Sequence, residues 1–152
     1  MAEPTLYVVA TPIGNLRDIT LRALDTLKSV DAIAAEDTRV SRKLLAHFGI
    51  RANLIPTHEH NEREAAQRLI ALLSQGKSVA LISDAGTPAI SDPGAIVVAQ
   101  VRAAGFRVVS VPGASAITTA IAAAGLQCAS FCFHGFLPAR KSEREKTLAA
   151  LK

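Results

Sequence analysis

The stretch VALISDAGTPAISDPG, residues 79–94, joins a short apolar run to a long loop of small and turn-forming residues. The run Val79–Ile82 is too short for a helix, and the turn residues Ser83–Pro88 end it, so it predicts a buried strand followed by a loop. In open α/β sheets ligands bind beyond the carboxyl ends of the strands, where glycine lets the backbone come close. The segment therefore predicts a ligand-binding loop with Asp84 as an acceptor. The alternative is an ordinary turn in which Asp84 caps its own loop.

Similar apolar runs alternate with helical patterns along much of the chain. This alternation predicts an α/β fold, with a mostly parallel sheet and helices on both faces. Strands are expected at residues 6–10, 31–35, 53–56, 79–82, 107–111 and 131–135, and helices after residue 18 and at 40–48, 61–74, 93–104 and 117–124.

Several helix ends carry recognisable start signals. Asp18 is expected to cap the first helix, Asn61 and Glu64 resemble a capping box, and Pro93 suits the first turn of its helix. The segment 117–124 is apolar almost throughout, which predicts a helix packed between the sheet and another surface.

Three predicted loops that follow strands are rich in Gly, Pro and small residues: Thr11–Asn15, Ser83–Pro88 and Pro112–Ala116. Because they follow parallel strands, they are expected to meet in one crevice. The chain has neither GxxxxGK[ST] nor GxGxxG, and proline removes N–H donors from these loops. The crevice therefore favours a ligand with little phosphate, such as an adenosyl amino acid, over ATP.

Two clusters of polar residues have alternative interpretations. Glu36, Asp37 and Arg39 follow the strand at 31–35; they are candidates for chemistry, or they mark a helix N-terminus with Thr38 as its cap. The segment 58–60 reads His-Glu-His, but it is not HExxH and has no partner cluster, so no metal site is predicted.

Composition limits the class of protein. The 152 residues, 49% hydrophobic and 20% charged, suffice for one domain with a core. No apolar run reaches the ~20 residues of a membrane span and the N-terminus lacks a basic signal region, so a cytoplasmic protein is expected. Cys128 and Cys132 have apolar neighbours and are expected in the core.

The net charge of +4 favours an anionic partner, although it partly reflects basic residues that gather near the C-terminus. One Tyr, five Phe and no Trp argue against a base-stacking platform for single strands. From Phe136 the composition changes to a basic run and then an amphipathic helix headed by Ser142. Residues 1–135 are therefore expected to form one α/β domain, and residues 136–152 a linker and the start of a second domain.

Four motifs carry a resemblance to a known family: ATPIGNLRDIT at 10–20, AEDTR at 35–39, HEHNE at 58–62 and LISDAGTPAISDPG at 81–94. Together they resemble the ribosomal RNA small subunit methyltransferase I family, within the tetrapyrrole methylase superfamily. The resemblance covers residues 6 to about 140. Ala10 departs from the proline that often precedes this first loop in the family, and the loop motif itself is intact.

The resemblance implies an S-adenosylmethionine-dependent enzyme that methylates the ribose 2′-hydroxyl of a cytidine in 16S rRNA. It implies the N-terminal domain of a two-domain fold, with the methyl donor held between the domains and the small ribosomal subunit as partner. Members form homodimers, so a homodimer is expected. Because the second domain is expected to be missing, residues 1–152 alone are expected to be inactive.

The resemblance also implies residue roles. The donor would contact three loops, and the catalytic candidates follow the second strand, with Asp37 taking the hydroxyl proton and Arg39 contacting a phosphate. The residues expected to contact the donor are Pro12, Ile13, Gly14, Asp84, Ala85, Gly86, Thr87, Gly113, Ser115 and Ala116.

Two alternatives stay open from the sequence. One is a tetrapyrrole methyltransferase that acts on a corrin-like macrocycle, an anionic substrate that would also suit the positive charge. The other is a non-catalytic nucleotide-binding or RNA-binding domain.

Overall fold

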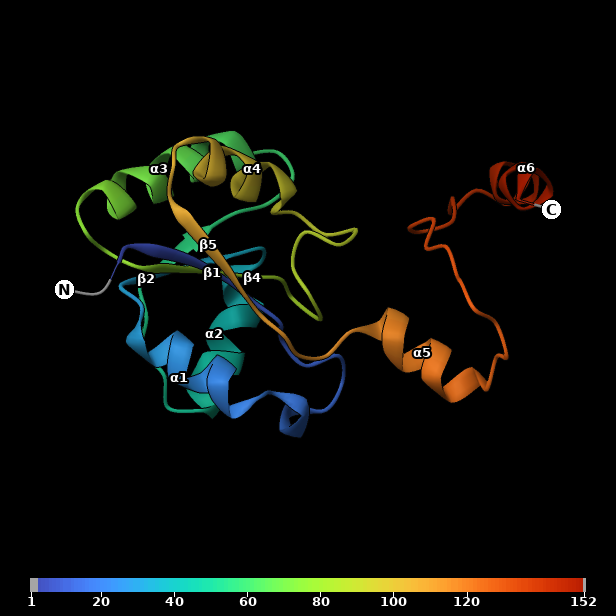
Figure 1. Ribbon diagram of the computed structural model, residues 1–152, viewed down its shortest axis with the longest axis horizontal. Coiled ribbons are helices and arrows are strands. Elements are labelled where there is room, and N and C mark those ends of the chain that lie inside the picture. The colour runs from blue at the N-terminus through green and yellow to red at the C-terminus, as the bar shows by residue number, and fades with distance from the viewer. Residues whose placement is uncertain (1–2, 152) are drawn as a thin grey trace.

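The computed structural model describes residues 3–151, which form a five-stranded sheet, flanking helices and a C-terminal extension (Figure 1). All strand pairs are parallel, in the order β3-β2-β4-β1-β5. The strands are β1 Thr5–Val9, β2 Ala32–Ala35, β3 Leu54–Pro56, β4 Val79–Ile82 and β5 Arg107–Val111. The helices are α1 Leu21–Ser29, α2 Thr38–His47, α3 Glu62–Ser74, α4 Ala95–Ala103, α5 Ala116–Ala124 and α6 Lys141–Ala150.

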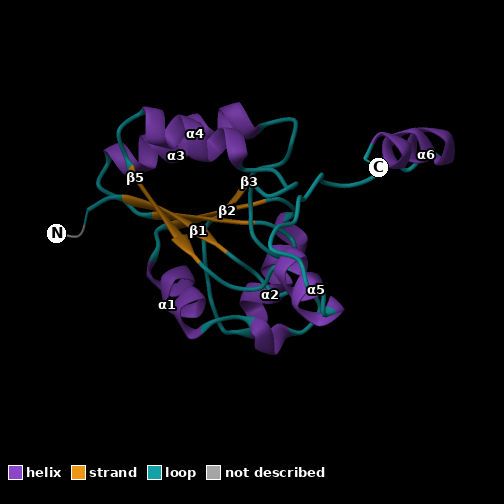
Figure 2. Cartoon of the chain, turned by 45° about the vertical axis from the view of Figure 1, so that its right-hand side comes forward, coloured by secondary structure: helices purple, strands orange, loops and turns teal. Residues whose placement is uncertain are grey.

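The predicted fold class is confirmed, since helices cover both faces of a parallel sheet. Helices α3 and α4 lie on one face, and α1 and α2 lie on the other (Figures 1 and 2). Right-handed crossovers explain this arrangement, because the connections through α1 and α2 move the chain toward β3 while those through α3 and α4 move it toward β5. The strand connections therefore reverse direction at β3.

Two apolar layers form the core, one on each face of the sheet. Every residue of β2 and β4 is buried, as expected for strands covered on both sides. On one side Leu6 and Leu81 pack in a layer with Leu69 of α3. On the other side Ile33 and Ile82 belong to a layer that includes Leu27 of α1 and Leu45 of α2.

Two predicted helix caps are wrong, although the helix predicted at 61–74 does begin after Asn61. Thr20 caps α1 by accepting a hydrogen bond from the Ala23 N–H (3.0 Å), whereas Asp18 lies in a short 3₁₀ turn, Leu16–Asp18. Asn61 makes no capping box, because its side chain accepts from the His58 N–H (2.8 Å) and donates to the Pro56 carbonyl (3.0 Å).

Helix α4 begins two residues later than its proline predicted. Gly94 precedes the helix with a φ of +128°, a value that favours glycine, and Pro93 lies outside the helix. A Cβ at Gly94 would lie 2.8 Å from Leu81 Cδ2, so the absence of a side chain also lets the turn pack on the core.

The region after β5 differs most from the predictions. Residues 131–135, expected as a strand, form no regular structure, and Cys128 and Cys132 are exposed. Helix α5 has no buried residue, although its composition predicted a packed helix. The physical reason is that this region extends away from the sheet, as Figures 1 and 2 show, and no described residue buries it. No helix among residues 3–151 has the length and apolar character that crossing a membrane requires.

Glu62 connects the two helices on one face of the sheet. It is buried at the start of α3, and its Oε2 accepts hydrogen bonds from the backbone N–H groups of Gly94 (2.9 Å) and Ile96 (3.1 Å). One carboxylate therefore satisfies two donors at the N-terminus of α4, where negative charge is favourable.

We expect Glu62→Ala to lower the free energy of unfolding by about 2–3 kcal/mol, because it leaves two backbone donors without their acceptor. Exposed Glu64, in the same first turn, is the matched control, and Glu64→Ala is expected to cost less than about 0.5 kcal/mol. Urea denaturation measures both variants. Equal losses would contradict this role for Glu62.

Candidate functional site

The loops that follow the strands meet at one edge of the sheet, because the carboxyl ends of all five parallel strands lie there. Two of these loops are joined by backbone hydrogen bonds. The Thr11 N–H donates to the Gly86 carbonyl (2.9 Å), and the Gly86 N–H donates to the Thr11 carbonyl (3.1 Å). The buried Thr11 hydroxyl also donates to the Ser83 carbonyl (3.2 Å). The first and central loops therefore form one rigid unit.

The loop after β5 is held against this unit. The Thr87 hydroxyl donates to the Ala114 carbonyl (3.3 Å). Gly113 lies so close to the first loop that a Cβ there would be 2.9 Å from Ala10 Cβ. The predicted convergence of three loops is thus present in the structure.

One hollow lies where the three loops meet, with a volume of about 350 Å³, and we call it the Gly86 hollow. Gly86 has a φ of +82°, and a Cβ there would approach Ile13 Cγ2 to 3.5 Å. A side chain at position 86 would thus be strained and would occupy the space beside Ile13. The lining residues are Ile13, Ala85, Gly86, Thr87, Ile90, Ser91, Asp92, Ser115, Ala116, Ile117, Phe133 and Phe136.

A second hollow, of about 480 Å³, is also lined by the first loop, and we call it the Lys43 hollow. It lies between that loop and α2. Its lining residues are Pro12, Gly14, Leu16, Val40, Lys43, Leu44, His47 and Asp84.

The structure divides the residues that sequence analysis assigned to the donor. Six of them line the Gly86 hollow, three line the Lys43 hollow, and Gly113 packs against Ala10 without lining either. The six are Ile13, Ala85, Gly86, Thr87, Ser115 and Ala116, and the three are Pro12, Gly14 and Asp84.

Sequence analysis missed other residues that line these hollows. Phe133 and Phe136 lie far along the chain in the predicted strand and linker, and the mixed polarity of α2 did not mark Lys43 or His47 as facing a loop. The close spacing of Phe131, Phe133 and Phe136 was the one sequence signal that could have marked the two phenylalanines.

Carboxylates gather beside the central loop. The Asp37 N–H donates to Asp84 Oδ1 (3.1 Å), and the Asp84 N–H lies 3.4 Å from Glu36 Oε2, so these backbone contacts connect the loops after β2 and β4. Burial raises the pKa of Glu36, and the nearby Asp84, Asp92 and Asp37 add to the shift. Burial also raises the pKa of Asp92. Of these residues, sequence analysis had not selected Asp92 and had given Glu36 no separate role.

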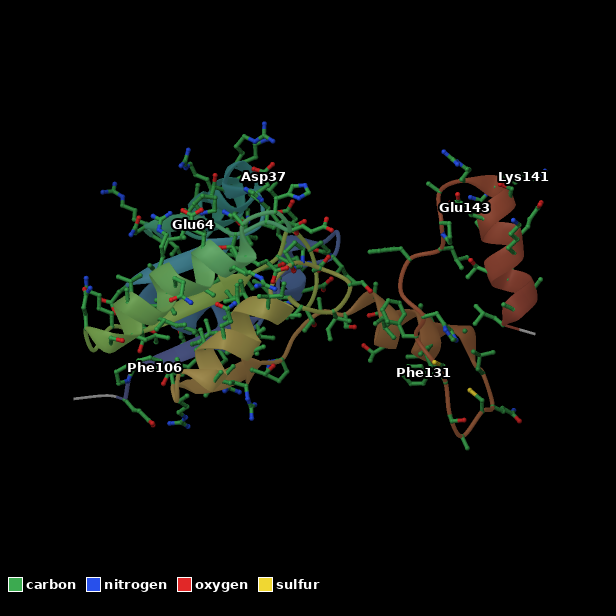
Figure 3. All side chains as sticks on the ribbon, turned by 90° about the horizontal axis from the view of Figure 1, so that it is seen from above. Asp37, Glu64, Phe106, Phe131, Lys141 and Glu143 are labelled. Atoms are coloured by element: carbon green, nitrogen blue, oxygen red, sulfur yellow. The ribbon has the colours of Figure 1, made fainter. Side chains whose placement is uncertain are left out.

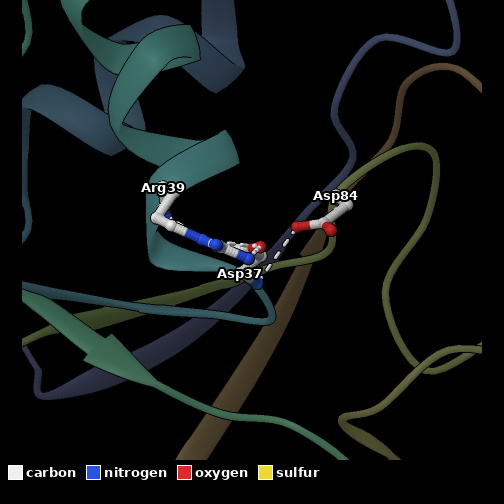
Figure 4. A network of polar contacts seen from close by, with 3 residues as sticks. All are labelled: Asp37, Arg39 and Asp84. Carbon is white, nitrogen blue, oxygen red and sulfur yellow. Dashed lines mark hydrogen bonds and ion pairs between the residues drawn. The ribbon is translucent and has the colours of Figure 1, made fainter.

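Asp37 and Arg39 are in direct contact at the start of α2 (Figure 4). Asp37 Oδ1 accepts from the Arg39 N–H (2.8 Å) and thereby caps the helix, and Arg39 Nη2 donates to Asp37 Oδ2 (2.7 Å). The cap is therefore Asp37, and the alternative prediction of Thr38 is wrong. Hydrogen bonds from Arg39 lower the pKa of Asp37 to about 2, which makes this carboxylate a weak base.

The described residues contain no cluster of three His, Cys, Asp or Glu side chains able to hold a metal ion. The rings of His58 and His60 lie 6.1 Å apart, and neither residue lines the Gly86 hollow or the Lys43 hollow.

The fold defines a doubly wound α/β domain whose loops converge at the carboxyl edge of the sheet, which is the candidate ligand site. The chain belongs to the family of tetrapyrrole (corrin/porphyrin) methylases, whose model matches residues 5–152. This agrees with the resemblance carried by the sequence motifs.

Curated relatives have closely similar sequences. The chain is 57% identical over 143 residues to the ribosomal RNA small subunit methyltransferase I of Haemophilus influenzae, which covers 94% of this chain and 50% of the relative. It is 55% identical over 152 residues to the protein of that name from Pseudomonas aeruginosa, covering 100% and 54% respectively. The chain thus spans about half the length of the curated relatives it matches.

A solved structure supports the fold. The uroporphyrin-III-C-methyltransferase of Thermus thermophilus superposes with a TM-score of 0.61 at 28% identity, over 80% of this chain and 52% of that one. A second structure of a Thermus thermophilus uroporphyrin III C-methyltransferase, at 20% identity, has the same TM-score and shows the shared fold.

The low pKa of Asp37 predicts a pH dependence of stability. Because the native state binds this proton less tightly than the unfolded state, ionised Asp37 stabilises the fold above about pH 4, and this contribution is lost as the pH falls to about 2. Asp37→Asn keeps a capping oxygen but no charge. We expect its melting temperature to lie below that of the parent at neutral pH and to converge with it between pH 4 and 2.

The matched control is Asp25→Asn, which changes an exposed aspartate of α1 that forms no ion pair among residues 3–151. It should show no such convergence. A constant gap between the parent and Asp37→Asn across this pH range would contradict the pairing.

Proposed function

We propose that this chain is the N-terminal, methyl-donor-binding part of an S-adenosylmethionine-dependent enzyme that methylates a ribose 2′-hydroxyl of cytidine in 16S rRNA. The observation that carries the proposal is the Gly86 hollow, which brings together six of the predicted donor residues from three loops. The names of the relatives at 55–57% identity support ribosomal RNA as the substrate.

The residues of the Gly86 hollow fit an adenosyl amino acid. Its volume of about 350 Å³ lies within the range of small-molecule sites, and its lining is mostly apolar with few polar groups. The bare backbone of Gly86 leaves room beside Ile13 that a side chain would fill. Ser115 precedes α5 and makes no capping hydrogen bond, so its hydroxyl and the helix N-terminus are available to a carboxylate.

The RNA substrate is favoured over the macrocycle by the degree of similarity. Relatives named as ribosomal RNA methyltransferases are about twice as similar in sequence as the uroporphyrin methyltransferase, which is 28% identical. We place the enzyme in the cytoplasm, as a homodimer that acts on the small ribosomal subunit. Residues 1–135 form the donor domain of this proposal, and residues 136–152 lead into a second domain.

The bound donor would supply an electrophilic methyl group on a sulfonium sulfur. The chain's own residues would then align the hydroxyl with that methyl group and accept its proton, and alignment contributes much of such a rate acceleration. Asp37 is the predicted proton acceptor and Arg39 the predicted phosphate contact. Glu36, whose pKa is raised, is the stronger base of the two neighbouring carboxylates and a second candidate acceptor.

Methylation assays with radiolabelled donor test this function. The full-length protein that contains this domain is expected to label 16S rRNA within small ribosomal subunits, and nuclease digestion should release 2′-O-methylcytidine. Residues 1–152 alone are expected to label nothing. Labelling of uroporphyrinogen III but not of RNA would overturn the proposal.

Binding of the donor can be tested at one lining residue. Ala116 lines the Gly86 hollow, and we expect Ala116→Phe to fill it and weaken binding of S-adenosylhomocysteine at least tenfold by isothermal titration. Ala120, one helical turn further along α5, is exposed and lies outside the hollow. Ala120→Phe should therefore change the affinity less than twofold. Equal effects of the two substitutions would place the donor elsewhere.

A further inference from the structure

The positive charge of this chain is unevenly distributed along the sequence. Residues 38–58 contain Arg39, Arg42, Lys43 and Arg51 and no Asp or Glu, whereas the rest of the chain has thirteen Lys and Arg against thirteen Asp and Glu. Residues 38–58 therefore carry four positive charges that no carboxylate of the same segment offsets. The C-terminal residues 136–152 also carry a net charge of +3, from five Lys and Arg against two Glu, so the sequence-based attribution of part of the charge to that segment holds.

These cations are exposed along α2 and the turn that follows it, beside the candidate site. Ser41 and Leu45 face the core, while the four basic residues are exposed; we call these four the α2 basic surface. Arg39 and Lys43 are four residues apart and share a helix face, which places them roughly 6 Å apart along the axis. Lys43 also lines the Lys43 hollow, opposite Pro12 and Asp84.

The surface continues past the end of the helix. Arg42 and Arg51 line a further hollow of about 560 Å³ between α2 and the edge strand β3. Basic side chains thus extend from the loop edge, where α2 begins, to the turn that leads into β3.

Most of these cations are not neutralised by neighbours. Among residues 3–151, no carboxylate pairs with Arg42, Lys43 or Arg51, and Arg39, although paired with Asp37, keeps 85% of its side chain exposed. Unpaired, clustered charges of this kind attract a polyanion.

The basic residues near the C-terminus provide a contrast. Arg140 lies 3.5 Å from Glu143, and Lys141 lies 3.8 Å from Glu145. Figure 3 shows Lys141 and Glu143 on α6, on the far side of the molecule from Asp37, and Phe131 on the segment between α5 and α6. Arg140 and Lys141 at the start of α6 are therefore each paired with a carboxylate, and α6 lies apart from the sheet.

We propose that the α2 basic surface binds the phosphate backbone of the RNA that carries the target nucleotide, so that the strand reaches the loops across the Lys43 hollow. This inference rests on the proposed function, which supplies RNA as the substrate class. Recognition here is mainly through phosphates, because the exposed side chains of this surface are cationic and His47 is the one aromatic ring in the lining of the Lys43 hollow. Binding at this surface is therefore tolerant of sequence and sensitive to salt.

The test measures RNA affinity of the full-length protein against salt concentration, with a single-stranded RNA of about 20 nucleotides and fluorescence anisotropy. Each phosphate contact contributes about 0.7 to the slope of log K against log salt for single strands. The double variant Arg42→Gln, Lys43→Gln is expected to reduce the slope by about 1.4. The charge-conserving Arg42→Lys, Lys43→Arg is expected to keep it.

The matched control is Arg140→Gln, Lys141→Gln, which removes the same charge from α6 and should leave the slope unchanged. An equal fall in both double variants would show a response to net charge alone and would overturn the proposal. So would an unchanged slope in the α2 variant. Melting curves of all variants confirm that they are folded.

Donor titration separates this proposal from the function on which it rests. The α2 double variant is expected to bind S-adenosylhomocysteine as the parent does, because neither residue lines the Gly86 hollow. Failure of the parent protein to bind the donor would overturn the proposed function. If the α2 double variant lost donor affinity while the parent bound the donor, the α2 basic surface would be part of the donor site, and the proposal that it binds RNA alone would be wrong.

Discussion

The pair of backbone hydrogen bonds between Thr11 and Gly86 fixes the geometry on which the site depends. These two bonds join the loop after β1 to the loop after β4. They use main-chain groups only, so they do not depend on which side chains the two residues carry. The Gly86 hollow and the Lys43 hollow are lined by alternate residues of the first loop, Ile13 in one and Pro12 and Gly14 in the other. A change in this bridge would therefore alter both hollows together.

The sheet was predictable from the sequence, and parts of the helices were not. Short apolar runs such as Val79–Ile82 determine strands locally, and their alternation with helices is enough to specify a parallel sheet. Helix starts depend on competing partners, so Asn61 bonded to the preceding turn and Gly94 adopted a positive φ that delayed α4. The segment after β5 was mispredicted because composition records apolar character but not which surface covers it.

The loops that form the candidate site were predictable from the sequence, but the hollow that each residue lines was not. The motif residues did converge, yet the sequence could not show that Asp84 and Ile13 line different hollows. The sequence also could not show that the carboxyl groups of Glu36 and Asp37 differ in basicity. Their pKa values shift in opposite directions because each group has different neighbours in the folded chain. Burial beside other carboxylates raises the pKa of Glu36, and the Arg39 guanidinium lowers that of Asp37.

The strand order has a consequence for how the chain acquires its structure. Strand β1 is made first, yet its two neighbours are β4 and β5, with Leu6 beside Val79 and Thr5 beside Arg107. During synthesis roughly a hundred further residues must therefore be made before β5 can pair with the second edge of β1. Pairings of such long sequence separation slow folding, because loop-closure entropy is lost before the contacts form. A nascent chain shorter than about 111 residues would leave an edge of β1 open to improper partners.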